Sequence, residues 1–152
     1  MIAPFLLPEL VLCRPAVKSR GALFDLLAAT VAPCLEAADP GEVVRLLEAR
    51  EAQCPTVTPE GVAFPHAVGP GISRTLVAVV TLDPPVEFDP RVPLASVVFA
   101  LFGSSSTPWE HVRLLARLAR IASSLAARRR LRDATSGDEI LQIVREEDRL
   151  HG

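Results

Sequence analysis

An unbroken apolar run near the middle of this 152-residue chain constrains its fold more than any other feature. Residues 96–102 read Ser-Val-Val-Phe-Ala-Leu-Phe, which is rich in strand-forming residues and shows no polar alternation. A strand that is apolar on both faces lies between two covering layers. A second strand is predicted over 75–82, ended by Pro84-Pro85, and shorter extended segments are predicted over 10–12 and 62–64. The chain therefore needs a sheet that is covered on both faces.

The covering layers are predicted from helix-capping residues and apolar spacing. The four predicted helices run from Ser19 to about Ala32, from Asp39-Pro40 to about Ala52, from Thr107-Pro108 to about Arg130, and from a capping box of Ser136 and Glu139 to about Asp148. Proline- and glycine-rich stretches are short enough to be loops, so no domain boundary is expected. The prediction is an α/β fold in which residues 1–152 form one domain, with helices flanking a sheet.

Composition excludes several classes of function. A net charge of -2 predicts no general attraction to nucleic acid or to anionic membranes, and the absence of tyrosine argues against a base-stacking surface. No apolar run reaches the roughly 20 residues of a membrane span. The first residues lack basic character and are interrupted by prolines, so no signal peptide is expected. The three cysteines lack metal-site spacing and are interpreted as reduced thiols of a cytoplasmic protein.

Three side chains are candidates for chemistry. His66 follows Pro65 at the exit of a predicted strand, where an imidazole can act as a nucleophile near neutral pH. His111 falls on the apolar stripe of the third predicted helix, in its first turn, and so points towards the sheet. Arg50 ends the apolar face of the second helix, and a charge at the edge of a core is costly without a partner. An anion bound near Arg50 would supply that partner.

Several segments of the chain resemble the fructose/mannitol class of enzyme IIA domains in the bacterial phosphotransferase system, including the nitrogen-regulatory IIA proteins. The resemblance depends on Arg50-Glu51, Pro55-Thr56, His111 and the segment Gly-Val-Ala-Phe-Pro-His over 61–66. It implies a mixed β-sheet with helices on both faces and a phosphoryl group accepted on His66. It also implies HPr as donor and a IIB domain as acceptor. Because a neutral imidazole can attack phosphorus without a metal, no cofactor or metal is expected. Arg50, Thr56 and His111 would donate hydrogen bonds to the phosphoryl oxygens.

Each assignment has a simpler alternative. His66 can be a structural or surface histidine, and His111 a core residue with its hydrogen bonds satisfied. Arg50 can pair with Glu51, and Thr56 can be a turn residue only. The arginines of the third helix form a stripe that is either solvated surface or a docking site for an acidic partner or a phosphate backbone: Arg113, Arg117, Arg120 and Arg128. A metal held by His66 and His111 would lack a third ligand.

Two functional hypotheses share the chemistry of His66. In the first, the protein is a phosphotransferase component that passes its phosphoryl group to a IIB domain for sugar uptake. In the second, phosphorylation of His66 switches binding to regulatory partners. A third possibility is a IIA-like sensor that binds a ligand and is never phosphorylated. The sequence names neither the sugar nor the acceptor.

Overall fold

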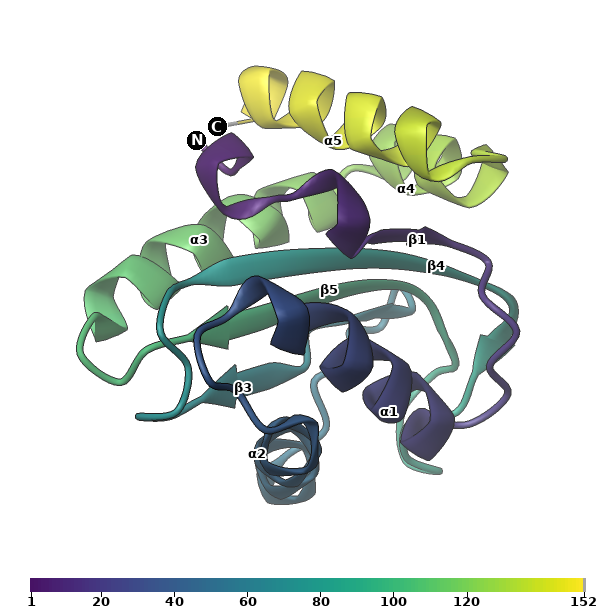
Figure 1. The fold of residues 1–152 in the computed structure, drawn as a ribbon. Helices are drawn as coiled ribbons and strands as arrows, with labels where there is room; N and C mark the ends of the chain where they lie inside the picture. Colours follow the sequence, from purple (N-terminus) through teal and green to yellow (C-terminus); the bar gives the residue numbers. More distant parts are fainter. Residues whose placement is uncertain (152) are drawn as a thin grey trace.

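The computed structural model describes residues 1–151 and contains a five-stranded sheet with five α-helices (Figure 1). The elements in chain order are η1 (Ala3–Phe5), η2 (Pro8–Leu10), β1 (Val11–Cys13), α1 (Arg20–Val31), η3 (Ala32–Cys34), α2 (Pro40–Gln53), β2 (Val62–Ala63), β3 (His66–Val68), β4 (Leu76–Val86), β5 (Ala95–Gly103), α3 (Pro108–Ser123), α4 (Leu125–Asp133) and α5 (Gly137–His151). Within these described residues, no helix combines the length and the apolar character that crossing a bilayer requires.

The sheet is mixed, as the family resemblance implies. Its strand order is β1-β4-β5-β2, and β3 also pairs with β5. β4 and β5 are antiparallel, whereas β1 is parallel to β4 and both β2 and β3 are parallel to β5. The predicted central strand is confirmed, because β5 has neighbours on both sides. The parallel pairing of β3 with β5 sets His66 beside Leu101, near the carboxyl end of β5.

Two hydrophobic cores cover the two faces of the sheet. Alternate residues of β5 divide between them: Val98, Ala100 and Phe102 face one core, while Val97, Phe99 and Leu101 face the other. α1 and α2 cover the first face, and the N-terminal segment covers the second together with α3, α4 and α5 (Figure 1). The layered α/β fold predicted from the sequence is therefore confirmed.

The prediction that Pro84 and Pro85 end the second strand was wrong. β4 continues to Val86, which pairs with Ala95. The register with β5 breaks after Thr81 and resumes at Val86, so the two prolines lie in an irregular, exposed stretch. A proline is tolerated in a strand where no partner requires its missing N–H group.

The predicted long helix to Arg130 is two helices. Ser124 adopts extended backbone angles, and its hydroxyl accepts a hydrogen bond from the Ala127 amide at 3.2 Å. Serine is a favoured N-cap because its oxygen satisfies an amide that the first turn leaves unpaired. Ser124 therefore ends α3 and starts α4.

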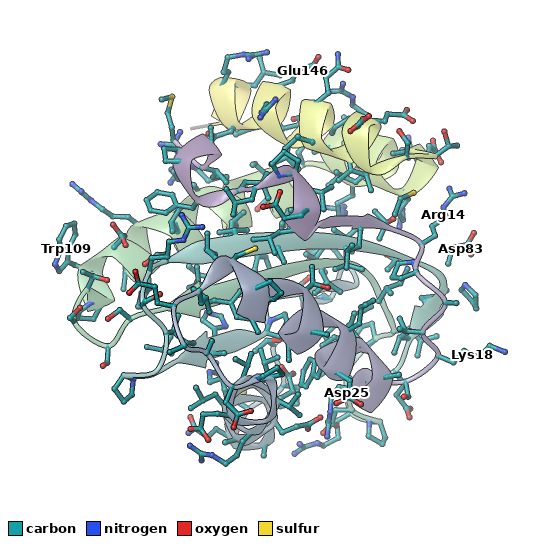
Figure 2. All side chains as sticks on the ribbon, viewed as in Figure 1. Arg14, Lys18, Asp25, Asp83, Trp109 and Glu146 are labelled. Atoms are coloured by element: carbon teal, nitrogen blue, oxygen red, sulfur yellow. The ribbon has the colours of Figure 1, made fainter. Side chains whose placement is uncertain are left out.

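Three of the four arginines of the predicted stripe are bonded to a neighbouring helix. Arg117 forms an ion pair with Asp148 of α5 at 2.9 Å, Arg120 donates to the His151 carbonyl at 2.8 Å, and Arg128 donates to the Ala122 carbonyl at 2.7 Å. These three arginines join helices to one another. Arg113 instead lies over the ring of Trp109, which projects from the first turn of α3 (Figure 2).

Candidate functional site

His66 is the first residue of β3, whereas the sequence suggested a loop after a strand. The extended segment 62–64 contains β2, which ends at Ala63, and Pro65 separates it from β3. The Pro65 carbonyl accepts the Leu101 amide at 2.9 Å, so the backbone on both sides of the histidine pairs with β5. This pairing holds the backbone of His66 in the sheet and thereby orients its imidazole.

The environment of the imidazole favours its neutral form. Burial lowers the pKa of His66 below its ordinary value of 6.5, and the charges of Arg50 and His111 lower it further. The backbone of Phe64 raises the pKa of His66, but by less than burial lowers it. Within residues 1–151, Nδ1 itself has no hydrogen bond of normal geometry. Nδ1 is buried, which leaves Nε2 as the nitrogen that a reacting group can reach.

Arg50 reaches the same site from α2. It lines a cavity of about 300 Å³ together with His66, Val68, Leu46, Ala49 and Gln53. Its Nη1 donates to the Cys54 carbonyl at 2.9 Å, so the guanidinium is anchored beside the histidine with further N–H groups left to donate. The alternative pairing of Arg50 with Glu51 does not occur in the structure.

Thr56 is held by a buried carboxylate. Glu51 is 3% exposed and accepts the Thr56 amide at 2.6 Å and the Thr56 hydroxyl at 2.9 Å. The same hydroxyl oxygen accepts the Phe64 amide at 3.2 Å. Its single proton is therefore donated to Glu51. Donation from Thr56 to a phosphoryl oxygen stays a prediction that requires this bond to break.

His111 packs directly on the backbone of β5. A Cβ atom on Gly103 would lie 2.0 Å from the His111 Nε2 and 2.4 Å from its Cε1, so only glycine leaves room for the ring. His111 is 8% exposed, and its Nε2 has no hydrogen-bond partner in the part of the chain that the structure describes. The alternative of a core histidine with satisfied hydrogen bonds does not fit this orphaned nitrogen.

The structure thus gathers His66, Arg50 and His111 and connects Thr56 to them indirectly. Sequence reasoning missed Gly103 and Glu51. A glycine at the end of an apolar strand, with a histidine one helical turn into the next element, was the available signal for Gly103. Glu51 follows Val43 and Leu47 at helical spacing, and that signal for its burial was not used. Within residues 1–151, no three side chains of the ligating types lie close enough to hold a metal ion.

Comparisons with known proteins place the chain in a family. The sequence matches, over residues 4–147, the family described as phosphoenolpyruvate-dependent sugar phosphotransferase system, EIIA 2. It is 31% identical over 128 residues to a nitrogen regulatory protein of Pseudomonas aeruginosa, covering 83% of this chain and 82% of that protein. The crystal structure of the nitrogen regulatory protein IIA-Ntr from Neisseria meningitidis matches with a TM-score of 0.86 and 26% identity, covering 94% of this chain and 98% of the other.

A more distant structure shares the fold alone. The complex of enzyme IIAMTL and phosphorylated enzyme IIBMTL from Escherichia coli matches with a TM-score of 0.75 and 18% identity, over 90% of this chain and 95% of that one. Fold and sequence together define a IIA component of a phosphotransferase system. The chain belongs to the EIIA 2 family.

Proposed function

We propose that the protein accepts a phosphoryl group on Nε2 of His66 from an HPr-like phosphocarrier. The observation that carries the proposal is the geometry of the imidazole: Nδ1 is buried, Nε2 is accessible, and burial keeps the ring neutral at physiological pH. A neutral nitrogen with a free lone pair is the nucleophile that phosphoryl transfer requires.

The transfer needs no external base. The Nε2 lone pair of His66 forms a bond to phosphorus while the bond from phosphorus to the donor nitrogen breaks, and the donor imidazole leaves with its own ring proton. The proton of His66 stays on the buried Nδ1. Little covalent chemistry remains for the protein, so positioning and charge stabilisation dominate the barrier.

Positive groups around the histidine supply that stabilisation. The Arg50 guanidinium lines the cavity beside His66, and its remaining N–H groups suit two phosphoryl oxygens. His111 presents an unpartnered ring nitrogen. Thr107 at the start of α3 forms no side-chain cap, so the first-turn amides of that helix also favour an anion.

The downstream role that the comparisons favour is regulatory. The relative that shares 31% of its sequence over most of both chains is a nitrogen regulatory protein, and so is the structure with a TM-score of 0.86. Phosphorylation would add charge beside an exposed surface and thereby alter partner binding. Transfer to a IIB domain for sugar uptake is the second candidate, and the E. coli complex with phosphorylated IIB favours it.

Intact-mass measurement tests the phosphoryl acceptance. The protein is incubated with phosphoenolpyruvate, enzyme I and HPr, alongside His66→Ala and the control His151→Ala, which alters a histidine paired with Glu147 near the end of α5. Wild type and His151→Ala are expected to gain one acid-labile phosphoryl group, and His66→Ala none. Equal labelling of all three proteins would refute the assignment. Loss of the label to an added IIB domain would favour the sugar-uptake role.

A further inference from the structure

We propose that Glu51 is a positioning residue for His66, acting through Thr56 and Phe64. The inference rests on the proposed phosphoryl transfer for its functional consequence, whereas the link itself is a property of the folded chain. In this proposal, Thr56 positions the segment that carries His66 and does not donate a hydrogen bond to the phosphoryl oxygens.

Burying the charge of Glu51 costs folding free energy, and a positioning role would explain why the residue lies there. Its side chain is 3% exposed and lies in the last turn of α2, where the helix dipole disfavours a negative charge. In the described residues, no lysine or arginine forms an ion pair with it. Among residues 1–151, the hydrogen bonds that its two oxygens accept both come from Thr56. The carboxylate is thus dedicated to a single residue.

Thr56 carries the restraint from α2 to the histidine segment. Its carbonyl and hydroxyl oxygens both accept the Phe64 amide, at 3.3 Å and 3.2 Å. The neighbouring residues Val57 and Ala63 form an antiparallel bridge, and the Thr58 amide donates to the Val62 carbonyl at 2.8 Å. Phe64 is therefore held on its N-terminal side by Thr56, two residues before His66.

The last step joins Phe64 to the imidazole. Phe64 lies two residues before His66, and its backbone raises the pKa of the imidazole, so holding Phe64 in place also holds the surroundings of the ring. A proton on Nδ1 leaves the Nε2 lone pair free for the phosphoryl group. Arg50 precedes Glu51 on the same helix, so one end of α2 places both the cation of the site and the restraint on its nucleophile. Releasing the link would let the segment shift and expose the imidazole.

Nuclear magnetic resonance of histidine-labelled protein tests the link without requiring phosphorylation. The variants are Glu51→Gln, which offers an amide N–H₂ to the donors of Thr56, Thr56→Val, which removes the hydroxyl, and Thr56→Ser, which keeps it. In Glu51→Gln and Thr56→Val, we expect the pKa of His66 to rise towards 6.5 and the Nδ1–H tautomer to lose population. Thr56→Ser should retain the wild-type values.

Transfer kinetics supply the second readout. A misplaced nucleophile lowers kcat by about tenfold or more, while KM for phosphorylated HPr stays unchanged because the docking surface is untouched. The control Val43→Ala opens a cavity in the same helix, at a side chain that is 2% exposed. It should lower stability without moving the pKa of His66 or kcat.

The outcomes separate this inference from the proposed function. A His66 pKa and tautomer that are unchanged in folded Thr56→Val and Glu51→Gln would overturn the link, and Thr56→Val alone decides if Glu51→Gln does not fold. A wild type that accepts no phosphoryl group, yet whose His66 titration moves in the variants, would overturn only the proposed function.

Discussion

Substitution of Gly103 by alanine should disturb the candidate site directly. The new Cβ would lie 2.0 Å from the His111 Nε2 and 2.6 Å from its Cδ2. Ordinary contact requires about 3.5 Å, so the ring must retreat by roughly 1.5 Å or the strand must move. His111 is buried on α3 and its ring is not the tip of a flexible chain, so the clash cannot be relieved by a simple rotation.

The expected cost follows from the overpacking of a filled core. Such changes destabilise by about 1–3 kcal/mol, which for a chain of this size lowers Tm by about 2–12 °C. If the proposed function holds, the displaced His111 no longer donates to the phosphoryl group, and losing one preorganised donor slows transfer by roughly 100-fold. Urea unfolding and single-turnover transfer from phosphorylated HPr measure the two effects.

A double-mutant cycle makes the reasoning refutable. In a His111→Ala background the space for the Cβ is open, so Gly103→Ala should cost less than about 0.5 kcal/mol. Gly71→Ala is the matched control, because a Cβ there meets no atom within 4 Å. Additive effects of Gly103→Ala and His111→Ala would contradict the proposed steric link between the two residues.

Three further outcomes are expected. Asp148 accepts hydrogen bonds from the Ile2 amide at 2.8 Å and from Arg117 at 2.9 Å, so Asp148→Asn should lower the free energy of unfolding in urea by about 2–3 kcal/mol, and an unchanged midpoint would contradict this role. Because the pKa of His66 is lowered, the transfer rate should hold as pH falls through 6.5 and decline only below it; a half-maximal rate above pH 6.5 would be inconsistent with burial as the cause. Between its lowered pKa and 6.5, His66 binds fewer protons in the folded state than in the unfolded state, so the folded state loses stability as pH falls. His66→Gln should lose less stability over that pH range, which would be measured as a smaller fall in Tm.

Much of the fold could be predicted because its signals are local. Ser19 and Asp39 accept the amides expected of N-caps, from Ala22 at 3.1 Å and Gly41 at 3.1 Å, and the helices begin where those residues indicate. The central position of β5 followed from its unbroken apolar run. Neither inference needed information about distant parts of the chain.

The errors arose where pairing or packing overrides a local preference. Ser124 lies inside the predicted helix, and its extended backbone with the hydrogen bond from the Ala127 amide shows that it caps a second helix. Pro84 is accommodated in β4 because the register with β5 breaks there. Charge spacing left the arginine stripe as solvated surface or a docking site, and it did not place Asp148 of α5 beside Arg117.

Some residues of the candidate site could be predicted from their chemical type, whereas others are defined by how the helices pack. His66, Arg50 and His111 were identified as chemistry-bearing residues, and the structure brings them to one end of the sheet. The 43/47/51 spacing places Glu51 on the buried face of α2, but its bonds to Thr56 and the contact between Gly103 and His111 depend on how α2 and α3 pack.

Nitrogen-15 spectroscopy of the phosphorylated protein tests the central claim most directly. With labelled histidine, long-range couplings between the ring protons and the two nitrogens identify which atom carries the phosphoryl group. Because Nδ1 of His66 is buried and Nε2 is accessible, the account predicts a single phosphohistidine, at residue 66, substituted on Nε2. A phosphoryl group on Nδ1, or on His111 or His151, would contradict it.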